Sequence, residues 1–402
     1  MQSDIPQDFK DYACALLGAE RYAPFARALT ESPSVSIRLN PLKAGKAGLS
    51  PFAVCGADMP VPWAADEACY LRERPHFTSD PLFHAGAYYV QEASSMFLGR
   101  ALRRYVKHPV VALDLCAAPG GKSTHIRACL PEGSLLVSNE PVKPRAQVLL
   151  ENMTKWGHPD VVVTHGYPQD FSRLPHFFDL LVTDVPCSGE GMFRKEDDAV
   201  AGWSMDAVRM CRDRQREILR DVWPALKPGG LLVYSTCTLN VLEDEENVAW
   251  IADELGAEVM PLEVPEEWGV TGNLLPGAGR RSAGCADSSF PVYHFIPGLA
   301  RGEGFFLAVL RKASDEGLVA VPPVGATVGD KGRRKKKKEK QPAPAAFPAV
   351  CKTWLVQSDE FDFLSVGDTW TARRKVFSQQ IEQLCAALCV WQAGVPVAVA
   401  KG

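Results

Sequence analysis

Two hydrophobic patterns alternate along the middle of the chain, between residues 110 and 311. Short apolar and β-branched runs are followed by longer segments in which hydrophobic residues recur every three or four positions. The first pattern predicts buried strands, and the second predicts amphipathic helices. Their alternation indicates an α/β fold, with a doubly wound, mostly parallel sheet and helices on both of its faces.

Seven strands are predicted in this sheet: 110–115, 134–139, 160–164, 178–184, 229–236, 257–262 and 304–311. Helices are predicted between them near 122–130, 143–156, 206–226 and 243–255. The last two strands are joined by a long excursion, which is typical of a doubly wound sheet with an antiparallel edge strand. In such a sheet the ligand binds at the carboxyl ends of the strands, near the point where the strand order reverses.

The first hundred residues predict a small α+β lobe. Residues 7–30 suggest two short amphipathic helices, broken near Gly18 and Pro24. Residues 34–43 alternate like a strand, and 86–105 read as a short extended piece followed by a helix. We therefore divide the chain into an N-terminal lobe, a central domain, a linker and a C-terminal segment, with bounds 1–105, 106–312, 313–350 and 351–402.

The predicted linker is rich in Pro, Gly and Ala and contains the run KGRRKKKKEK at 331–340. This run carries a charge of +7, and the whole chain carries −4, so the remainder carries −11. A block of like charges is usually a solvated, disordered segment, but it also suits a flexible tether for RNA phosphates. Both interpretations remain open. The residues after the linker resume as strand and helix, which predicts a short C-terminal α+β segment.

The composition, 46% hydrophobic and 23% charged, is that of an ordinary globular protein. No uninterrupted apolar stretch of about 18 residues occurs, which argues against a membrane span. The N-terminus lacks the basic and apolar regions of a secretory signal, and twelve cysteines without a signal are typical of reduced thiols in a cytoplasmic protein. No C-x-x-C pair occurs, and Cys385 and Cys389 lie merely one helical turn apart, so no metal site is predicted.

The segment VVALDLCAAPGGKST (110–124) reads as a strand ending on Asp114, a glycine-rich loop, and a helix from Lys122 onward. This order places backbone N–H groups and a helix N-terminus beside a small polar or anionic ligand. A nucleoside-triphosphate loop is excluded, because Cys116 stands five residues before Gly121, where that motif needs glycine. The dinucleotide fingerprint G-x-G-x-x-G is also absent, although Glu140 lies at about the distance of a ribose-binding carboxylate. An ordinary strand-to-helix turn is the remaining alternative.

Two cysteines follow directly on neighbouring predicted strands. Cys187 comes after the fourth strand and Cys237 after the fifth, so both thiols should reach the crevice beside the glycine-rich loop. Asp114, Glu140 and Asp184 stand at or just past strand ends on the same rim. A lone buried cysteine is most often a small hydrophobic residue, and that interpretation is preferred for the other ten.

Three of these segments together resemble the NOL1/NOP2/Sun family of S-adenosylmethionine-dependent RNA cytosine-5 methyltransferases. They are Asp-Leu-Cys-Ala-Ala-Pro-Gly-Gly-Lys-Ser-Thr (114–124), Asp-Val-Pro-Cys-Ser-Gly (184–189) and Ser-Thr-Cys-Thr (235–238). Further agreement comes from residues 36–43, 88–96, the helix around Gln215, and 302–312. The greatest likeness is to the bacterial 16S ribosomal RNA branch with a C-terminal RNA-binding extension. The resemblance implies a class I methyltransferase fold, an RNA-binding N-terminal lobe, and a partial, PUA-like RNA-binding segment at the C-terminus.

The resemblance also implies roles for four residues. Carbon 5 of cytosine is a poor nucleophile, and addition of a thiolate to carbon 6 makes it enamine-like and able to accept a methyl group. In the family the attacking position corresponds to Cys237, and the position that assists product release corresponds to Cys187. Asp184 would stabilise charge that accumulates on the base, and Lys122 would serve in the active site. The residues alone leave open which thiol attacks.

For the cofactor, the matching positions are Cys116, Ala117, Ala118, Pro119, Gly120, Gly121, Lys122, Glu140, Tyr167 and Asp184. Glu140 would bind the ribose hydroxyls, and Asp184 would lie near the methionyl end. Two positions depart from the family pattern. Tyr167 stands where an adenine-contacting Asp is usual, with Asp170 as the nearest acid, and Gly298 stands where the family has His.

The resemblance therefore implies methylation of cytosine carbon 5 in RNA, with 16S ribosomal RNA as the expected substrate, and we expect a monomeric enzyme. The target base must leave its stack to reach a thiol, so a loop or an exposed helix junction is expected. The alternatives are a transfer RNA cytosine-5 methyltransferase, a methyltransferase acting on amino groups, and a non-catalytic RNA-binding ribosome-assembly factor. An amino-group enzyme would carry Asn/Asp-Pro-Pro-aromatic after the fourth strand and would have no use for Cys237.

Overall fold

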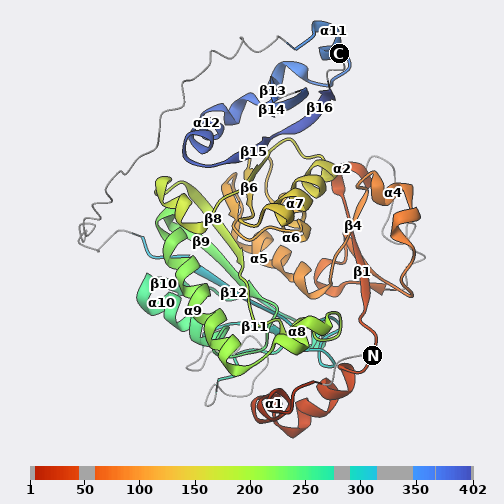
Figure 1. Cartoon of the computed structure of the whole chain (residues 1–402), viewed down its shortest axis with the longest axis vertical. Helices are drawn as coiled ribbons and strands as arrows, with labels where there is room; N and C mark the ends of the chain where they lie inside the picture. The colour runs from red at the N-terminus through yellow and green to blue at the C-terminus, as the bar shows by residue number, and fades with distance from the viewer. Residues whose placement is uncertain (1–4, 45–58, 276–289, 315–346, 367, 400–402) are drawn as a thin grey trace.

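The computed structural model describes residues 5–44, 59–275, 290–314, 347–366 and 368–399 (Figure 1). The lysine-rich run and most of the predicted linker lie outside the described residues. Among the described helices, none has the length and the apolar character needed to cross a membrane. The chain is built around one large central sheet, with a smaller sheet near each end of the sequence.

The central sheet has nine strands. Its order is β10 (Ala257–Val259), β12 (Phe305–Lys312), β9 (Leu226–Thr236), β8 (Phe178–Asp184), β5 (Val111–Asp114), β6 (Leu135–Asn139), β7 (Val161–Thr164) and β15 (Val390–Ala393), and β11 (Tyr293–Phe295) pairs with β12. The run β9-β8-β5-β6-β7 is parallel. This confirms the doubly wound, mostly parallel α/β fold and all seven predicted strands.

The two additional strands and the position of β12 differ from the prediction. β12 runs antiparallel but does not form the edge, because β10 pairs with its outer side. β15 comes from the C-terminal segment and pairs antiparallel with β7, which extends the opposite edge of the sheet. The C-terminal segment therefore contributes directly to the central domain.

Alternate residues of each central strand enter two separate hydrophobic cores. Ala112 of β5, for example, lies in the core on one face, and Leu113 lies in the core on the other. The first face is covered by α5 (Leu98–Tyr105), α6 (Gly121–Cys129) and α7 (Lys143–Trp156), and the second by α9 (Met205–Val222), α10 (Glu245–Leu255) and α12 (Ser378–Ala387). Burial on both faces explains why these strands read as continuous apolar runs.

The N-terminal lobe is a four-stranded antiparallel sheet in the order β2 (Met59–Pro60), β3 (Ala68–Leu71), β1 (Val35–Leu39) and β4 (Tyr88–Val90). Two single-turn helices, α2 (Pro41–Ala44) and α4 (Pro81–His84), flank it. The helix α1 (Gln7–Ala28) is interrupted at Gly18, whose φ of 72° is left-handed, and contains Pro24. This confirms the predicted break at Gly18, whereas the helix continues through Pro24.

Helix α1 packs against the central domain through aromatic side chains. The ring of Phe9 lies 4.9 Å from Phe193 and 5.3 Å from Trp203, measured between ring centroids. Both partners flank α8 (Asp197–Gly202), which follows β8. The first segment of the chain therefore supports the loop that leads away from Cys187 (Figure 1).

A buried ion pair ties this loop to the start of β12. Arg194 and Glu303 form a bidentate pair, with the two N–O distances at 2.5 and 2.8 Å and both side chains less than a tenth exposed. Arg194 also donates to the carbonyl of Ala28 at the end of α1. Three segments distant in sequence thus meet at a single guanidinium.

Replacing Glu303 by Ala is expected to lower the free energy of unfolding by about 3–5 kcal/mol, because it leaves the buried guanidinium unpaired. Urea unfolding of the full chain measures the change. The matched control removes an exposed pair: Asp206→Ala breaks the contact with Arg209 at 2.8 Å and should change stability by at most about 1 kcal/mol. Equal effects of the two substitutions would contradict the expectation.

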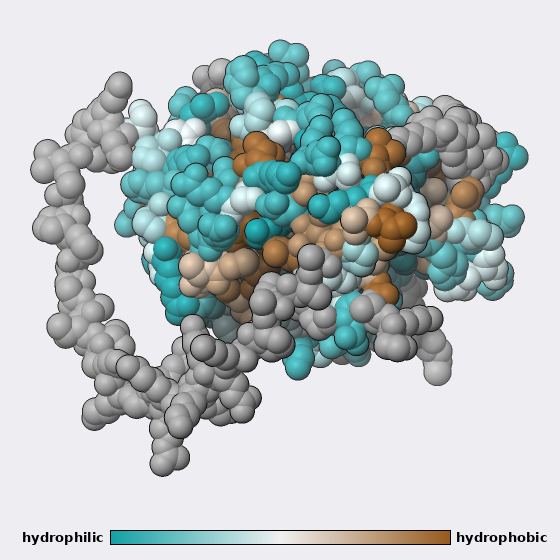
Figure 2. All heavy atoms as spheres, turned by 90° about the horizontal axis from the view of Figure 1, so that it is seen from above, coloured by the Kyte–Doolittle hydropathy of each residue, from teal (hydrophilic) through white to brown (hydrophobic). Residues whose placement is uncertain are grey.

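The C-terminal segment forms a three-stranded antiparallel sheet of β13 (Phe361–Val366), β14 (Thr369–Arg374) and β16 (Val395–Val399), preceded by α11 (Ala349–Lys352). Figure 2 views the molecule from this end and shows hydrophobic groups in separate patches among hydrophilic ones. Large apolar side chains exposed on this segment are Val350, Trp354, Val356, Leu364, Val376 and Val399. They are six of the twelve exposed large hydrophobic residues in the described part of the chain.

Candidate active site

The glycine-rich loop between β5 and α6 is held by contacts with β4 and α7. Gly120 precedes α6 with a φ of +114°, a conformation that L side chains rarely adopt. A Cβ on Gly121 would stand 3.3 Å from the ring of Tyr89, so β4 approaches the loop closely. The amide of Asn152 on α7 donates to the carbonyl of Pro119 at 2.8 Å. The loop backbone is therefore fixed before any ligand binds.

Arg38 of the N-terminal lobe anchors the first turn of α6. Its fully buried guanidinium donates to Thr124 Oγ1 at 2.7 Å and to the carbonyl of Gly121 at 3.3 Å, and lies 4.7 Å from the ring centroid of Trp156. Burial lowers the pKa of Arg38 to about 10, so it remains charged at neutral pH. Arg38 was not predicted as a site residue. Its place in the SIRLN strand gave only a weak signal, because its partners in α6 lie more than 80 residues away.

Three carboxylates follow the strand order along the rim of the sheet. Asp184 ends β8, Asp114 ends the adjacent β5, and Glu140 follows the next strand, β6. Asp114 is fully buried, and its Oδ2 accepts from Ser123 at 2.6 Å while Oδ1 has no hydrogen-bond partner among the described residues. Glu140 accepts from the N–H of Val142 at 2.9 Å. This acidic row lies at the reversal of strand order, beside the loop.

Lys122 and Asp184 form an ion pair at the first turn of α6. The Nζ of Lys122 lies 2.8 Å from Asp184 Oδ2, and Ser235 donates to Asp184 Oδ1 at 2.9 Å. Burial pulls the pKa of Lys122 down, but the carboxylate of Asp184 outweighs burial and the pKa is raised. Lys122 is therefore an ammonium group, held over the ring of Phe305 at 5.3 Å from its centroid.

The two thiols face each other at the ends of β8 and β9. Cys187 Sγ lies 3.1 Å from Cys237 Sγ, and the N–H of Cys237 donates to Cys187 Sγ at 3.3 Å. The cause is the parallel register that sets Asp184 opposite Ser235, so that the chains leave the sheet side by side. The hydrogen bond to Cys237, together with burial, raises the pKa of Cys187 well above that of an ordinary thiol. Cys187 therefore keeps its proton at neutral pH.

A buried carboxylate that was not predicted supports both thiol loops. Glu243 accepts from the N–H of Ser188 at 3.1 Å and from the amide of Gln215 at 2.7 Å. The same amide donates to the carbonyl of Pro186 at 2.9 Å. The residue before Cys187 and the residue after it are thus both fixed by one network on α9 and the loop after β9.

Comparison with known proteins identifies the family. Residues 106–311, just over half of the chain, match the family model described as 16S rRNA methyltransferase RsmB/F. Residues 5–93 match the one described as the N-terminal domain of 16S rRNA methyltransferase RsmF. The chain belongs to the RsmB/F family. This confirms the predicted NOL1/NOP2/Sun membership and the likeness to its bacterial 16S branch.

Curated relatives of the RsmB/F family agree with this assignment. Ribosomal RNA small subunit methyltransferase F of Salmonella heidelberg (strain SL476) is 37% identical over 304 residues, or 73% of this chain. The protein of the same name from Salmonella enteritidis PT4 gives the same values. The chain spans 60% of the length of these two relatives.

Solved structures share the fold. A methyltransferase homolog from Pyrococcus horikoshii is 28% identical, with a TM-score of 0.63, and the match covers 76% of this chain and 95% of that one. NSun6 from Pyrococcus horikoshii gives a TM-score of 0.63 at 19% identity, covering 77% and 99% of the two chains. The class I methyltransferase fold expected from the sequence is thereby confirmed.

S-adenosylmethionine is the methyl donor of the RsmB/F family, and the residues of this chain fit it. The cofactor offers hydroxyl and ammonium donors, and the rim offers carboxylate acceptors. Asp114 Oδ1 is buried and unpartnered among the described residues, and Glu140 Oε2 has its nearest cation, Arg145, at 3.6 Å. Carboxyl oxygen atoms that can accept further hydrogen bonds thus lie beside the fixed loop. Burial raises the pKa of the Cys116 thiol, so this loop residue is neutral.

The two departures from the family pattern have distinct structural settings. Tyr167 follows β7 with 53% of its surface exposed, and its N–H donates to Asp170 at 3.0 Å. Asp170 also lies 3.5 Å from Arg173, so its carboxylate closes a local turn. Gly298 has a φ of +84°, and a Cβ there would stand 2.4 Å from the carbonyl of Pro24. Helix α1 thus occupies the space that a side chain at 298 would need.

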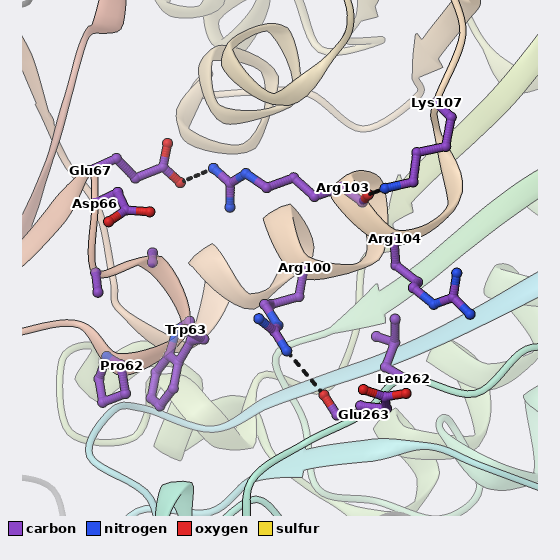
Figure 3. A pocket seen from close by; sticks show the side chains of 12 residues that line it. Pro62, Trp63, Asp66, Glu67, Arg100, Arg103, Arg104, Lys107, Leu262 and Glu263 are labelled. Carbon is purple, nitrogen blue, oxygen red and sulfur yellow. Dashed lines mark hydrogen bonds and ion pairs between the residues drawn. The ribbon is translucent and has the colours of Figure 1, made fainter.

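A cavity of about 500 Å³ lies apart from the thiols, between α5 and the short helix at Pro62–Ala64 (Figure 3). Its basic side chains are Arg100, Arg103, Arg104 and Lys107, which the sequence left open as a basic face or a favourable helix C-terminus. Figure 3 shows Arg103 paired with Glu67, at 2.6 Å, and Arg100 turned to the backbone of Glu263. Asp66 also lines the cavity, so its charge is mixed.

Stability should depend on pH through Asp114. Burial raises the pKa of Asp114 from 3.8 to about 7. At a pH between these two values the native state therefore keeps the proton, whereas the unfolded state has lost it. The resulting stabilisation is complete below about pH 4 and is lost as pH rises through 7, an effect of up to about 4 kcal/mol. In cofactor-free protein, Asp114→Asn should remove this part of the decline in the free energy of unfolding with rising pH. Urea unfolding at pH 5 and pH 8 measures it, and identical slopes for the two proteins would contradict it.

Proposed function

We propose that this protein methylates carbon 5 of cytosine in RNA, with the 16S ribosomal RNA of the small subunit as its substrate. The observation that carries the proposal is the pair of thiols, 3.1 Å apart, at the ends of adjacent strands beside the cofactor loop. A single buried thiol would have a structural explanation. Two that converge on the rim where the cofactor fits suit an addition and elimination at carbon 6, in which one sulfur attacks and the other assists release.

Cys237 is the proposed nucleophile. Its sulfur adds to carbon 6 of the ring, forming an S–C bond and placing the electron pair at carbon 5. Carbon 5 is then able to accept the methyl group that S-adenosylmethionine supplies when bound. Loss of the carbon-5 proton to a base and cleavage of the S–C bond restore the aromatic ring and the Cys237 thiolate.

The position of Cys187 suits the same division of labour, because the N–H of Cys237 donates to its sulfur. Cys187 lies against the attacking sulfur and is held by the network of Glu243. We assign to Cys187 the assistance in elimination that follows methyl transfer.

Lys122 and Asp184 are proposed to stabilise the charge that develops on the base. Their ion pair is fixed by Ser235 and by the first turn of α6, so its dipole is oriented before the substrate binds. Oriented charges in a site that excludes water stabilise developing charge without further reorganisation. Cys116 to Lys122 and Glu140 would hold the cofactor, with Tyr167 near its adenine.

The proposed partner is RNA, contacted by the N-terminal lobe, the C-terminal segment and the lysine-rich run at 331–340. We further propose a monomer in the cytoplasm. The ten described cysteines are free thiols, which suits a reducing compartment. The flipped base would come from an unpaired or exposed position, because a stacked base cannot reach Cys237.

Tritium release tests the proposal. Purified protein and S-adenosylmethionine are incubated with carbon-5-tritiated cytidine in small ribosomal subunits, naked 16S RNA or transfer RNA. Release from small subunits or 16S RNA is expected, because only carbon-5 methylation breaks that C–H bond. Release from transfer RNA alone would favour a transfer RNA enzyme. Absence of release from all three, with binding retained, would leave an RNA-binding assembly factor and end the proposal.

A further inference from the structure

A buried polar cluster lies behind the loop that carries Cys237. It consists of Asp244, Glu245 and His294, which come from the start of α10 and from β11. All three side chains are fully buried. One ligand-type nitrogen or oxygen atom from each lies within 4.8 Å of those from the other two. Residues about 50 positions apart in sequence therefore converge on one point.

Three atoms of this cluster have no hydrogen-bond partner in the described part of the chain: Asp244 Oδ2, Glu245 Oε2 and His294 Nδ1. Their other atoms are satisfied. Thr236 donates to Asp244 Oδ1 at 2.6 Å, and the N–H of Leu274 donates to Glu245 Oε1 at 2.7 Å. An unsatisfied buried polar group is unfavourable by about 1–3 kcal/mol, so three in one place indicate a bound species.

The spacing of these atoms suits an ion better than a direct contact. His294 Nδ1 lies 3.9 Å from Asp244 Oδ2, which is too long for a hydrogen bond. Metal–nitrogen and metal–oxygen bonds of about 2.0–2.2 Å allow one ion to bridge that distance. His294 Nε2 lies 2.9 Å from Glu245 Oε1, and a carboxylate on the second ring nitrogen is how metal-binding histidines are oriented.

The charge balance also calls for a cation. Among the ion pairs of the described residues, Asp244 and Glu245 pair with His294 alone, and neither meets Lys or Arg. Without a cation, burial raises the pKa of Asp244, so this carboxyl keeps its proton. A bound cation would displace that proton and balance the charge. A second group of ligand-type residues, Glu67 with His125 and Cys129, differs in this respect, because Arg103 already neutralises Glu67 at 2.6 Å.

We propose that Asp244 Oδ2 and His294 Nδ1 bind one divalent transition-metal ion, with Glu245 orienting the imidazole through its Nε2. An imidazole ligand beside a carboxylate favours zinc, cobalt or manganese over magnesium, which prefers oxygen ligands. The ion joins the start of α10 to β11 and, through Thr236, to the residue before Cys237. Its role is to stabilise this loop, and it takes no part in methyl transfer. The sequence had predicted no metal site, since these ligands share no short spacing.

Cobalt(II) is the probe, because its spectrum identifies its ligands. Chelator-treated full-length protein is titrated with Co²⁺, desalted, and examined by elemental analysis, absorption and thermal melting. One Co²⁺ per chain is expected, with the visible bands of a nitrogen and oxygen site and a raised melting temperature. A thiolate-to-cobalt charge-transfer band would place the ion on a cysteine, either in the Cys187–Cys237 pair or at Cys129, and would overturn the proposal. Absence of bound metal after desalting would overturn it too.

Variants locate the site. Asp244→Asn and His294→Gln should each weaken Co²⁺ binding by roughly 10–100-fold and abolish the gain in melting temperature. Glu190→Gln is the matched control: it changes a buried carboxylate of the same region whose oxygens already accept from Trp203, Asn240 and Leu239. It should keep the metal. If all three variants retain Co²⁺ equally, the assignment of the site is refuted. If a variant fails to fold, the spectrum of the wild-type protein still shows whether the ion has nitrogen and oxygen ligands.

Discussion

Cys237→Ala is expected to lower methyl transfer to RNA by at least about 10⁴-fold and to form no covalent RNA adduct, because it removes the sulfur that adds to carbon 6. Cys187→Ala is expected to accumulate such an adduct, since addition proceeds and elimination stalls. Denaturing gel electrophoresis with labelled RNA separates the adduct, and tritium release measures turnover. The outcome follows from the geometry: the thiols lie 3.1 Å apart, so both reach the same base.

Cys129→Ala serves as the matched control for both variants. Its thiol lies at the end of α6 remote from the glycine-rich loop, and burial raises its pKa to about 12, so it is a neutral packing group. It should retain activity and form no stable adduct. An adduct with Cys237→Ala and none with Cys187→Ala would exchange the assigned roles. Loss of activity in all three would point to a general effect on folding.

The central sheet could be predicted because each strand carries its own signal. Burial on both faces makes 110–115 or 178–184 a continuous apolar run, and no distant partner is needed to recognise it. The strand β15 carries no such signal. Val390–Ala393 is only partly buried and becomes a strand by pairing with β7, more than 220 residues earlier in the chain. The place of β15 in the sheet therefore depends on tertiary contacts, which the local sequence does not show.

The same distinction separates the site residues. The convergence of Cys187 and Cys237 could be predicted from the sequence, because each follows directly on a recognisable strand and the two strands are neighbours. Arg38 and Glu243 could not. Each is a charged residue of ordinary local sequence, and its importance comes from partners on other elements, such as Thr124 for Arg38. Buried polar anchors are recognised by their distant contacts, and one sequence does not display those.

The proposed metal site shows most clearly what cannot be predicted from a single sequence. Metal sites are read from sequence by closely spaced Cys and His residues. His294 lies 49 residues from Glu245, and the antiparallel pairing of β11 with β12 brings it back to the start of α10. The acidic run before α10 looks like an ordinary charged helix start. Only the convergence of unsatisfied atoms distinguishes it.

Asp184→Asn is expected to reduce the turnover number by about 10²–10³-fold while the protein stays folded. The substitution keeps the size of the side chain and its contact with Ser235 but removes the negative charge that fixes the ammonium of Lys122 at 2.8 Å. The loss of that carboxylate also removes the interaction that raises the pKa of Lys122. Single-turnover methylation at saturating RNA and cofactor isolates the chemical step from binding.

Asp179, at the other end of β8 from Asp184, provides a matched control. Asp179 on β8 pairs with Lys227 at 2.6 Å and accepts from the N–H of Val111, remote from the thiols. Asp179→Asn therefore removes an Asp–Lys pair of the same type and should leave single-turnover methylation within about threefold of wild type, since a partly exposed pair contributes at most about 1 kcal/mol. If the two variants lose activity equally, Asp184 acts through the stability of β8 and not through the reacting base. If Asp184→Asn alone loses it, the charge beside Lys122 is part of the chemistry.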